Sequence, residues 1–305
     1  MNKDMSSTLE EVGEDFLLRR FAARLEPKGR LVVGPGDDCA VVRPEMGGDI
    51  LLKTDAVIEG VHFIPGTEPA LVGHKAMARV ASDFAAMGGR PEHFLVTMLL
   101  RADTPLDWLD SFYQGAGEAI EAWDATIAGG ETGRMPASGP QVISIAATGC
   151  LPSGDPILRS GGQPGDILLV TGRLGGSFAS GRHLTFTPRL REAAWLAAHC
   201  RPSAMMDLSD GLARDLPRLA EASRCSFLID PASIPLHEGC DATHAAGDGE
   251  DYELLAAISA GKIPDLRSQW TAEFPDTPLT PIGRLTPSGT PATPLNGGWD
   301  HFSHA

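Results

Sequence analysis

The stretch GHKAMARVASDFAAMGGRPEHFLVTMLL, residues 73–100, contains the two kinds of element that decide the fold. Residues 73–88 are rich in alanine and contain no proline, which predicts a closely packed helix that ends at Gly88 and Gly89. Residues 93–100 form a long apolar run without alternation, which predicts a strand that is buried on both faces. A tightly packed helix followed by a buried strand indicates a globular protein with a substantial core.

Outward from this stretch, strands and helices follow one another without a regular period. We predict strands at residues 31–34, 39–42, 49–55, 126–131, 142–151, 166–172, 226–230 and 252–258, and helices at residues 9–25, 106–123, 175–183, 190–199 and 209–223. Pro27 and Gly29 are expected to end the first helix, and Pro217 is expected to disturb the last one. Hairpin-like strand pairs mixed with helices favour an α+β fold over a regular βαβ alternation.

The length of 305 residues suggests two domains. A turn-rich segment, RSGGQPGD at residues 159–166, follows the last strand of the first half. We therefore expect an N-terminal α+β domain over residues 1–150 and a C-terminal α+β domain over residues 151–305.

The charge and the apolar runs exclude several classes of protein. A formal net charge of −15 disfavours a basic groove for nucleic acid and docking to anionic lipid. The first residues lack the pattern of a signal peptide, and no apolar run approaches the roughly 20 residues of a membrane helix. The five cysteines include no C-x-x-C pair, so we expect unpaired thiols. We expect a cytoplasmic protein with neither a nucleic-acid nor a membrane partner.

Acidic residues recur at turns beside the apolar strands, and their positions are Asp37, Asp38, Asp55, Glu131, Asp207, Asp210, Glu250 and Asp251. An aspartate in a glycine-rich turn is often only a turn former or a helix N-cap, and this alternative stays open for Asp37 and Asp210. Asp83 is different, because it lies in an alanine-rich helix among residues expected to be buried. A buried carboxylate needs a partner.

If these motifs converge, divalent cations are the natural compensation for their charge. Several carboxylates on several turns suggest several hard cations, such as Mg²⁺, with a polyphosphate between them. That arrangement is typical of phosphoryl transfer. The chain contains neither a P-loop motif nor the protein-kinase motifs. TGRLGGS, residues 171–177, would either cradle a phosphate through its N–H groups or form a plain turn.

Seven motifs occur in order along the chain: GPGDDCAVV (34–42), KTDAVIEGVHF (53–63), ASDFAAMGG (81–89), AGGETGR (128–134), RSGGQPGD (159–166), MMDLSDGLARDL (205–216) and GEDYELL (249–255). Together they resemble the thiamine-monophosphate kinase family, in the superfamily of aminoimidazole ribonucleotide synthetase and selenophosphate synthetase. The resemblance implies an N-terminal domain whose strands build a dimer barrel, and a C-terminal α/β sandwich packed on it. It also implies a homodimer that phosphorylates thiamine monophosphate to thiamine diphosphate with ATP and Mg²⁺.

The resemblance also implies roles for individual residues. Those that match the family's Mg²⁺ ligands are Asp38, Thr54, Asp55, Asp83, Glu131, Asp207 and Asp210. Those that match ATP contacts are Tyr113, Gly130, Glu131, Arg159 and Ser209. Those that match substrate contacts are His62, Glu250 and Trp299, and an aromatic ring such as that of Trp299 suits a cationic thiazolium. Taken alone, Trp299 is more often a packing residue and His62 an ordinary histidine.

Two positions depart from the family's usual pattern. Glu131 stands where the family usually has Asp. Its side chain is one methylene longer, which changes the distance at which the carboxylate would hold a metal ion. Lys53 stands where many relatives carry Ser, so a hydroxyl is replaced by a positive charge. Either the Lys53 ammonium replaces the charge of one ion, or the side chain points away, as alternate residues of a strand do.

The resemblance implies direct in-line transfer without a catalytic general base. The acceptor is a phosphate monoester that is largely dianionic at pH 7. Bound Mg²⁺ would reduce the repulsion between the two polyanions. One alternative is a sister ATP-dependent synthetase of the superfamily, although Cys39 lies after the aspartate pair and not in a glycine-rich N-terminal segment. Another alternative is a nucleotide-binding module without catalysis.

Overall fold

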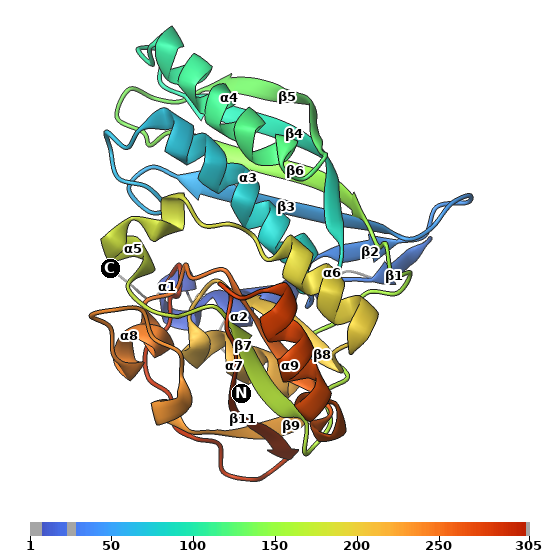
Figure 1. The fold of residues 1–305 in the computed structure, drawn as a ribbon. Coiled ribbons are helices and arrows are strands. Elements are labelled where there is room, and N and C mark those ends of the chain that lie inside the picture. Colours follow the sequence, from blue (N-terminus) through green and yellow to red (C-terminus); the bar gives the residue numbers. More distant parts are fainter. Residues whose placement is uncertain (1–7, 23–28, 303–305) are drawn as a thin grey trace.

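The computed structural model describes residues 8–22 and 29–302 and confirms the α+β class, with one sheet in each of two lobes (Figure 1). The first sheet has the order β1-β2-β3-β6-β4-β5, in strands β1 (Leu31–Val33), β2 (Ala40–Val42), β3 (Ile50–Ile58), β4 (Arg90–Leu100), β5 (Thr126–Arg134) and β6 (Val142–Cys150). Its neighbours are antiparallel except β4 and β5, which run parallel. We call this sheet, with its helices, the first lobe.

The second sheet is antiparallel throughout and has the order β8-β10-β7-β11-β9. Its strands are β7 (Ile167–Thr171), β8 (Ala204–Leu208), β9 (Cys225–Ile229), β10 (Glu253–Ile258) and β11 (Leu279–Pro287). This sheet and its helices form the second lobe. We keep residue 150 as the proposed domain boundary, because β6 ends there and β7 belongs to the other sheet.

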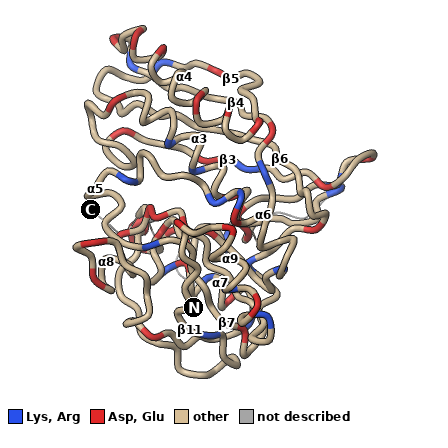
Figure 2. Tube along the Cα trace, in the orientation of Figure 1, with Lys and Arg blue, Asp and Glu red and all other residues tan. Residues whose placement is uncertain are grey.

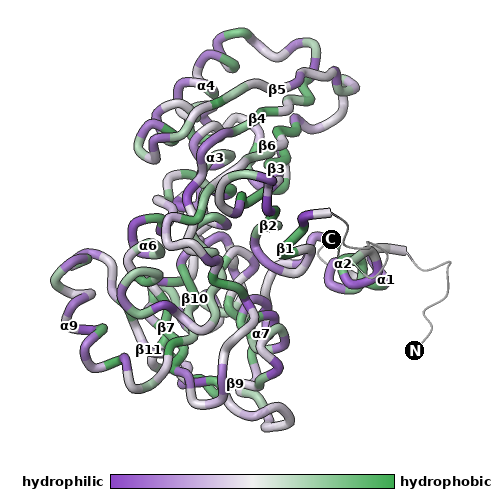
Figure 3. Tube along the Cα trace, turned by 90° about the vertical axis from the view of Figure 1, so that its right-hand side faces the viewer, coloured by the Kyte–Doolittle hydropathy of each residue, from purple (hydrophilic) through white to green (hydrophobic). Residues whose placement is uncertain are grey.

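Two helices cover one face of the first sheet, α3 (Pro69–Ala86) and α4 (Leu106–Glu121). In Figure 3 both lie to one side of β3, β4 and β6. The alternation of β3 follows from this arrangement, since Leu51 and Val57 are buried beneath the helices while Leu52 is exposed on the other face. Leu95 of β4 is also exposed, with a relative accessibility of 49%. The first sheet therefore has one buried face and one open, partly apolar face.

Small residues set the distance between α3 and α4. A Cβ atom on Gly73 would lie 2.1 Å from the Phe112 carbonyl oxygen, and one on Gly115 would lie 2.0 Å from that of Ala70. Both glycines therefore permit a backbone contact that any larger residue would push apart. The alanine-rich composition of residues 73–88 also lets the end of α3 enter the apolar core between the lobes, where Ala85 and Ala86 are buried.

Helices cover both faces of the second sheet. One face packs against α7 (Leu212–Ala222), and the other against α6 (Leu190–His199) and α9 (Ile263–Glu273). β10 consequently has no exposed residue and alternates between the two cores, with Leu255 facing α7 and Leu254 facing α6 and α9. No helix in the described part of the chain is long and apolar enough to cross a membrane.

The remaining helices are short and lie at the lobe surfaces. They are α1 (Leu9–Val12), α2 (Glu14–Ala22), α5 (Ser177–Ser180), α8 (Ala242–Gly247) and the 3-10 helices Arg182–Leu184, Pro231–Ser233 and Ala260–Lys262. α2 packs on the second lobe although it belongs to the start of the chain. Asp15 accepts hydrogen bonds from Arg214 at 2.8 Å and from Arg218 at 2.9 Å.

Several element boundaries differ from the sequence predictions. The helix predicted over residues 9–25 is divided at Gly13, whose φ of 74° interrupts it, and residues 23–28, with Pro27, lie outside the described residues. α3 begins four residues before the predicted start, because Pro69 suits the first turn of a helix. The predicted helix 175–183 is two short helical segments separated by Gly181. β8, α8, α9 and β11 were not predicted from the sequence.

An ion pair between Lys75 and Glu250 connects the two lobes. Lys75 of α3 is fully buried, and its Nζ donates to a carboxylate oxygen of Glu250, in the turn before β10. Lys75 also donates to the His62 carbonyl oxygen at 2.6 Å and lies 2.7 Å from His183 Nδ1. Burial raises the pKa of Glu250, but His183 and Lys75 outweigh it and hold the pKa at about 2.

We expect Lys75→Met to lower the free energy of unfolding by about 3 kcal/mol or more, because it leaves the Glu250 charge buried without its partner. Urea denaturation at pH 7 measures this loss. The difference between the proteins should shrink as the pH falls from 4.5 toward 2, because the pKa of Glu250 is depressed from 4.5 to about 2. Burial lowers the pKa of Lys75 to about 8, so the difference should also shrink as the pH rises above about 8 and the ammonium loses its charge.

Lys262→Met is the matched control, because that lysine is exposed and its Nζ donates only to the Cys200 carbonyl oxygen among the bonds of the described residues. We expect it to change the free energy of unfolding by less than about 1 kcal/mol. Equal losses in the two variants would contradict a stabilising role for the Lys75–Glu250 pair.

Candidate active site between the lobes

A cavity of about 600 Å³ lies where the two lobes face each other, and we call it the acidic cavity. Charged residues of both signs lie along the chain at this junction in Figure 2. The cavity is lined by Glu14, Asp15, Leu18, Arg19, Pro35, Gly36, Asp37, Lys53, Asp55, Arg79, Asp83, Arg159, Asp207, Ser209, Asp210, Arg218, Glu221, Ala222, Tyr252 and His301. Residues from distant parts of the chain thus meet in one acidic space.

Three buried aspartates form a cluster: Asp38 from the turn before β2, Asp83 from α3 and Asp207 from β8. Asp83 and Asp207 line the cavity, and Asp38 is not among its lining residues. Each offers a carboxylate oxygen, and these oxygens lie within 4.8 Å of one another. Three convergent carboxylates are the donor set that hard divalent cations prefer. These residues therefore fit a bound Mg²⁺ ion.

Each carboxylate of the cluster has one close partner in the protein. Arg159 Nη2 donates to Asp38 at 2.7 Å. Lys53 Nζ donates to Asp83 at 2.6 Å, and the Ser82 hydroxyl donates to Asp207 at 2.6 Å. Lys53 therefore points into the acidic cavity and not away from it, which decides between the two orientations that the sequence left open.

The cluster retains excess negative charge despite these partners. Burial raises the pKa of Asp207 to about 6, and the neighbouring Asp38 adds to the increase. Burial likewise raises the pKa of Asp83 well above its usual range, against the lowering effect of Lys53. Burial alone would lower the pKa of Lys53, but Asp83 and Asp55 raise it, so the ammonium stays charged. The raised pKa values mean that Asp83 and Asp207 take up protons more readily than exposed carboxyls, and a divalent ion would compete with those protons.

Asp55 lies on the same face of β3 as Lys53 and is paired with Arg79 of α3. The closest nitrogen and oxygen atoms are 3.2 Å apart, and Arg79 also donates to the Ala56 carbonyl oxygen at 2.9 Å. Burial raises the pKa of Asp55, but Arg79 and Lys53 outweigh it and hold the pKa below its usual value. Asp55 is therefore an ionised ligand candidate beside the cluster.

Asp210 and Ser209 follow β8 on the opposite wall. Arg218 of α7 donates to Asp210 at 2.5 Å and to Asp215 at 3.1 Å, and the Asp210 amide donates to Asp215 at 3.0 Å. The N-terminal Asp15 accepts from the same guanidinium. Arg218, Asp15 and Asp215 were not predicted from the sequence. The Arg218–Asp15 contact joins segments about two hundred residues apart, and Asp215 acquires its place through Arg218 and the Asp210 amide.

His62 has a defined tautomer. Its Nδ1 accepts from the Ile58 amide at 3.0 Å, so the ring proton lies on Nε2. That Nε2 is buried without a hydrogen-bond partner. Burial and Arg79 lower the pKa of His62 to about 3, which keeps the ring neutral. Its Nε2–H is therefore an unused donor, and the ring lies 5.6 Å from that of His301, which lines the cavity.

Trp299 lies on the final segment of the chain, beside the Asp210 wall. Its amide donates to the Asp210 carbonyl oxygen at 2.8 Å, and its indole Nε1 donates to His301 at 3.2 Å. The ring is half-buried. Glu250, from the lobe-connecting pair, accepts from the Tyr252 hydroxyl at 3.4 Å, and Tyr252 lines the cavity. The three predicted substrate contacts are thus placed around the junction of the lobes.

The structure places other predicted residues away from the cavity lining. Thr54 lies on the open face of the first sheet, where its hydroxyl donates to the Ile145 carbonyl oxygen at 2.9 Å. Gly130 and Glu131 lie on the edge strand β5, both exposed. Tyr113 is an exposed residue of α4, packed edge-on against Phe112.

The glycine cluster 171–177 has its N–H groups engaged by carboxylates. The Gly175 amide donates to Asp251 at 3.0 Å, and the Gly176 amide donates to Asp248 at 2.8 Å. These contacts favour the plain-turn alternative over a phosphate cradle.

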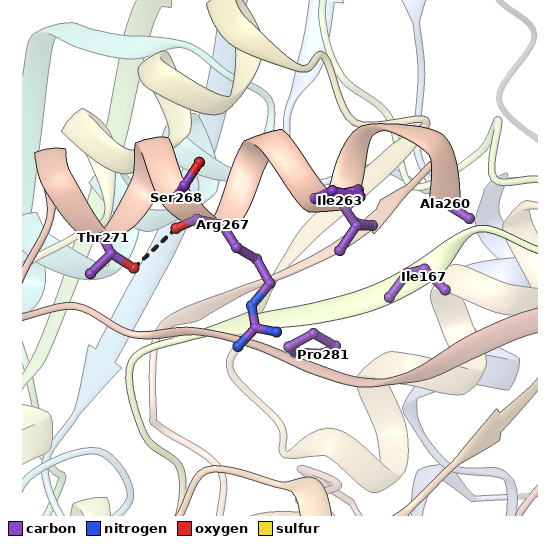
Figure 4. Close-up of a pocket in the computed structure, with 8 residues that line it drawn as sticks. Ile167, Ala260, Ile263, Arg267, Ser268, Thr271 and Pro281 are labelled. Atoms are coloured by element: carbon purple, nitrogen blue, oxygen red, sulfur yellow. Dashed lines mark hydrogen bonds between the residues drawn. The ribbon is translucent and has the colours of Figure 1, made fainter.

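A second, shallow pocket lies on the outer side of the second lobe, between α9 and the strands β7 and β11 (Figure 4). Its lining is mainly apolar, and Arg267 is the one charged side chain that borders it among the described residues. None of the predicted site residues lines this pocket. The chemistry of the described chain is concentrated in the acidic cavity.

The sequence is similar to proteins of known activity. Residues 36–151 match the family model of the AIR synthase related protein, N-terminal domain. The thiamine-monophosphate kinase of Rhodopirellula baltica is 33% identical, over 89% of this chain and 89% of that protein. The thiamine-monophosphate kinase of Escherichia coli K12 is 31% identical, over 95% of this chain and 98% of that protein.

Solved structures give the same result. A structure described as AaThiL complexed with AMPPCP and TMP has a TM-score of 0.82 at 28% identity, and the match covers 98% of this chain and 100% of that one. Thiamine-monophosphate kinase from Stenotrophomonas maltophilia has a TM-score of 0.72 at 30% identity, over 90% of this chain and 94% of that one. The hydrogenase maturation protein HypE of E. coli shares the fold alone, at 20% identity and a TM-score of 0.68.

Because protons compete with a cation for the Asp38–Asp83–Asp207 cluster, we expect the affinity for Mn²⁺ to fall as the pH is lowered through about 6, the pKa of Asp207. One displaced proton corresponds to about a tenfold loss for each pH unit. The electron paramagnetic resonance signal of free Mn²⁺, measured from pH 8 to pH 5, checks this.

Asp207→Asn should bind Mn²⁺ more weakly than the parent protein at pH 8. Asp265→Asn, an exposed change on α9, should follow the parent curve. An affinity that stays constant from pH 8 to pH 5 would rule out metal binding at this cluster.

Proposed function

The chain belongs to the thiamine-monophosphate kinase family, and from this premise we propose that it transfers the γ-phosphoryl group of ATP directly to thiamine monophosphate, with Mg²⁺ held in the acidic cavity. The observation that carries the proposal is the buried cluster of Asp38, Asp83 and Asp207 at the junction of the lobes. A charged cluster of this kind is expensive to bury without a cation. Phosphoryl transfer supplies both the cation and the anionic ligand that the cavity can hold.

The cavity offers two groups of candidate metal ligands. Asp38, Asp55 and Asp83 belong to the first lobe, and Asp207 and Asp210 to the second. When bound, Mg²⁺ would neutralise charge on the polyphosphate and screen the repulsion between donor and acceptor. Thr54 and Glu131 are the remaining proposed ligands, and both lie on the first sheet outside the lining of the cavity.

The basic side chains of the cavity are fixed in position by carboxylates. Arg159 makes two hydrogen bonds to Asp38, and its amide donates to Asp37 at 2.6 Å. Ser209 lies on the second-lobe wall of the same cavity. We assign Arg159 and Ser209 to the ATP end of the site. Tyr113, Gly130 and Glu131 complete this proposed group from α4 and β5.

The acceptor end lies toward the lobe-connecting pair. The Nε2–H of His62 is a neutral donor suited to an oxygen atom of the acceptor. Glu250 supplies negative charge and Trp299 an aromatic face, both of which suit the cationic ring of thiamine. The similar structure described with AMPPCP and TMP contains such a pair of ligands. We therefore assign His62, Glu250 and Trp299 to substrate binding.

The proposed transfer is in line and uses no general base. The acceptor phosphate is largely dianionic at pH 7, so no proton has to be removed before it attacks the γ-phosphorus. The new bond joins an acceptor oxygen to the γ-phosphorus, and the bond that breaks joins the γ-phosphorus to the oxygen that leaves with ADP. His62 stays neutral because its pKa is about 3, and its task is to orient the acceptor.

We also propose that the chain acts as a homodimer in the cytoplasm. The open face of the first sheet carries exposed Leu52 and Leu95 beside Ala146, and a second copy of the sheet would cover them. All five cysteines are unpaired, which suits a reducing compartment.

Product analysis tests the activity. With ATP, Mg²⁺ and thiamine monophosphate, we expect thiamine diphosphate and ADP to form one for one, and no diphosphate from free thiamine. Binding of ATP without ADP release would instead indicate a nucleotide-binding module. ADP release with a different acceptor would indicate a sister synthetase.

Asp55→Ala and Asp210→Ala should each lower turnover by about 10²-fold or more, because each removes a carboxylate from the proposed metal site. Far-ultraviolet circular dichroism should show that both variants are folded. Asp265→Ala, on the exposed face of α9, should retain parent turnover. Full activity of Asp55→Ala and Asp210→Ala would refute the metal assignment.

For the dimer, we expect sedimentation velocity to give twice the 32.2 kDa of one chain. Leu95→Glu places a charge on the open face and should give monomers, whereas Leu228→Glu, at an exposed position of β9, should not. A parent protein that sediments as a monomer would be evidence against the dimer.

A further inference from the structure

Among the described residues that line the acidic cavity, Lys53 is the one lysine, and its ammonium lies against the carboxylate cluster. Nζ is 2.6 Å from Asp83 Oδ1, and the two side chains are only 23% and 9% exposed. At this distance the ammonium occupies space from which a metal ion would approach that oxygen. Lys53 and a cation therefore compete for Asp83.

The alternation of side chains along β3 determines which face of the sheet Lys53 lies on. Lys53 and Asp55 both line the cavity, two residues apart on one face of the strand. Thr54 lies on the other face, where its hydroxyl is bonded to the Ile145 carbonyl oxygen. Reversing the direction of Lys53 would also turn Asp55 out of the cavity. The Lys53 side chain therefore lines the cavity as a consequence of the strand geometry that also places Asp55 there.

Lys53 changes the charge balance of the cluster. Of the three carboxylates, Asp38 is paired with the Arg159 guanidinium, and Asp207 with the neutral Ser82 hydroxyl. The Lys53 ammonium is the close cationic partner of Asp83. Without this ammonium, two of the three carboxylates would have no hydrogen-bonded cation within the described residues. Buried charges of this kind require compensation.

We propose that the Lys53 ammonium is a fixed cation that takes the place of one divalent ion at Asp83. The chain then binds one ion fewer with its nucleotide than the same chain does without that ammonium. This inference rests on the proposed function, because it takes the acidic cavity as the metal site. Lys53 is a positioning residue, since it acts through Asp83 and not on the reacting atoms.

The test is to count the Mn²⁺ ions bound to each chain in the presence of a non-hydrolysable ATP analogue at pH 8, from the electron paramagnetic resonance signal of free Mn²⁺. Lys53→Ser removes the ammonium and leaves space and an oxygen ligand, so we expect one more Mn²⁺ ion per chain. Lys53→Arg keeps the charge and should keep the parent count. Lys262→Ser, at an exposed lysine outside the cavity, should also keep it.

An unchanged count in Lys53→Ser, or a gain in Lys53→Arg, would overturn the proposal. Lys53→Gln, uncharged but similar in length, is measured in parallel, so that poor folding of the serine variant leaves a second measurement. A gain is expected there as well, and a Gln variant that binds the analogue without an extra ion would also overturn the proposal. The count requires no turnover, so a parent protein that fails to make thiamine diphosphate contradicts the proposed function alone.

Discussion

Electrostatic repulsion among buried carboxylates is the constraint on which the rest of this structure depends. Asp38, Asp83 and Asp207 are brought within 4.8 Å of one another by three elements that belong to both lobes. Such an arrangement is stable only if cations and donors are fixed around it. Arg159, Lys53 and Ser82 meet this requirement. Lys53 and Ser82 belong to β3 and α3, which also carry core residues, and Arg159 lies in the segment between β6 and β7.

The two sheets differ in how many of their faces are covered and in how they carry the residues of the cluster. The second sheet is covered on both faces, and β8, which carries Asp207, is buried along its whole length. The first sheet is covered on one face only, and its covering helix α3 carries Lys75, Arg79 and Asp83 toward the junction. One helix with small side chains therefore supplies the lobe-connecting lysine, a partner for Asp55 and a cluster ligand.

The sequence was sufficient for the fold class and for singling out the three aspartates that cluster, Asp38, Asp83 and Asp207, because both depend on local patterns. Asp83 stood out since a carboxylate in an alanine-rich helix has no local explanation. β11 was missed because Pro281, Gly283 and Pro287 give it the composition of a loop. The orientation of Lys53 could not be deduced from the sequence. Which of the two alternating sets of side chains faces the cavity depends on which face of the sheet the helices cover. Arg218 lacked any signal, since it binds Asp210 in its own neighbourhood together with Asp15 from the start of the chain.

α2 places residues from the beginning of the chain beside candidate-site residues that come much later in the sequence. Glu14 and Asp15 line the acidic cavity, and Asp15 shares the Arg218 guanidinium with Asp210. Removing the first 22 residues would release that guanidinium from one of its anions and open one wall of the cavity. Loss of α2 would consequently alter the candidate site itself, although α2 lies far from β8 and α7 in the sequence.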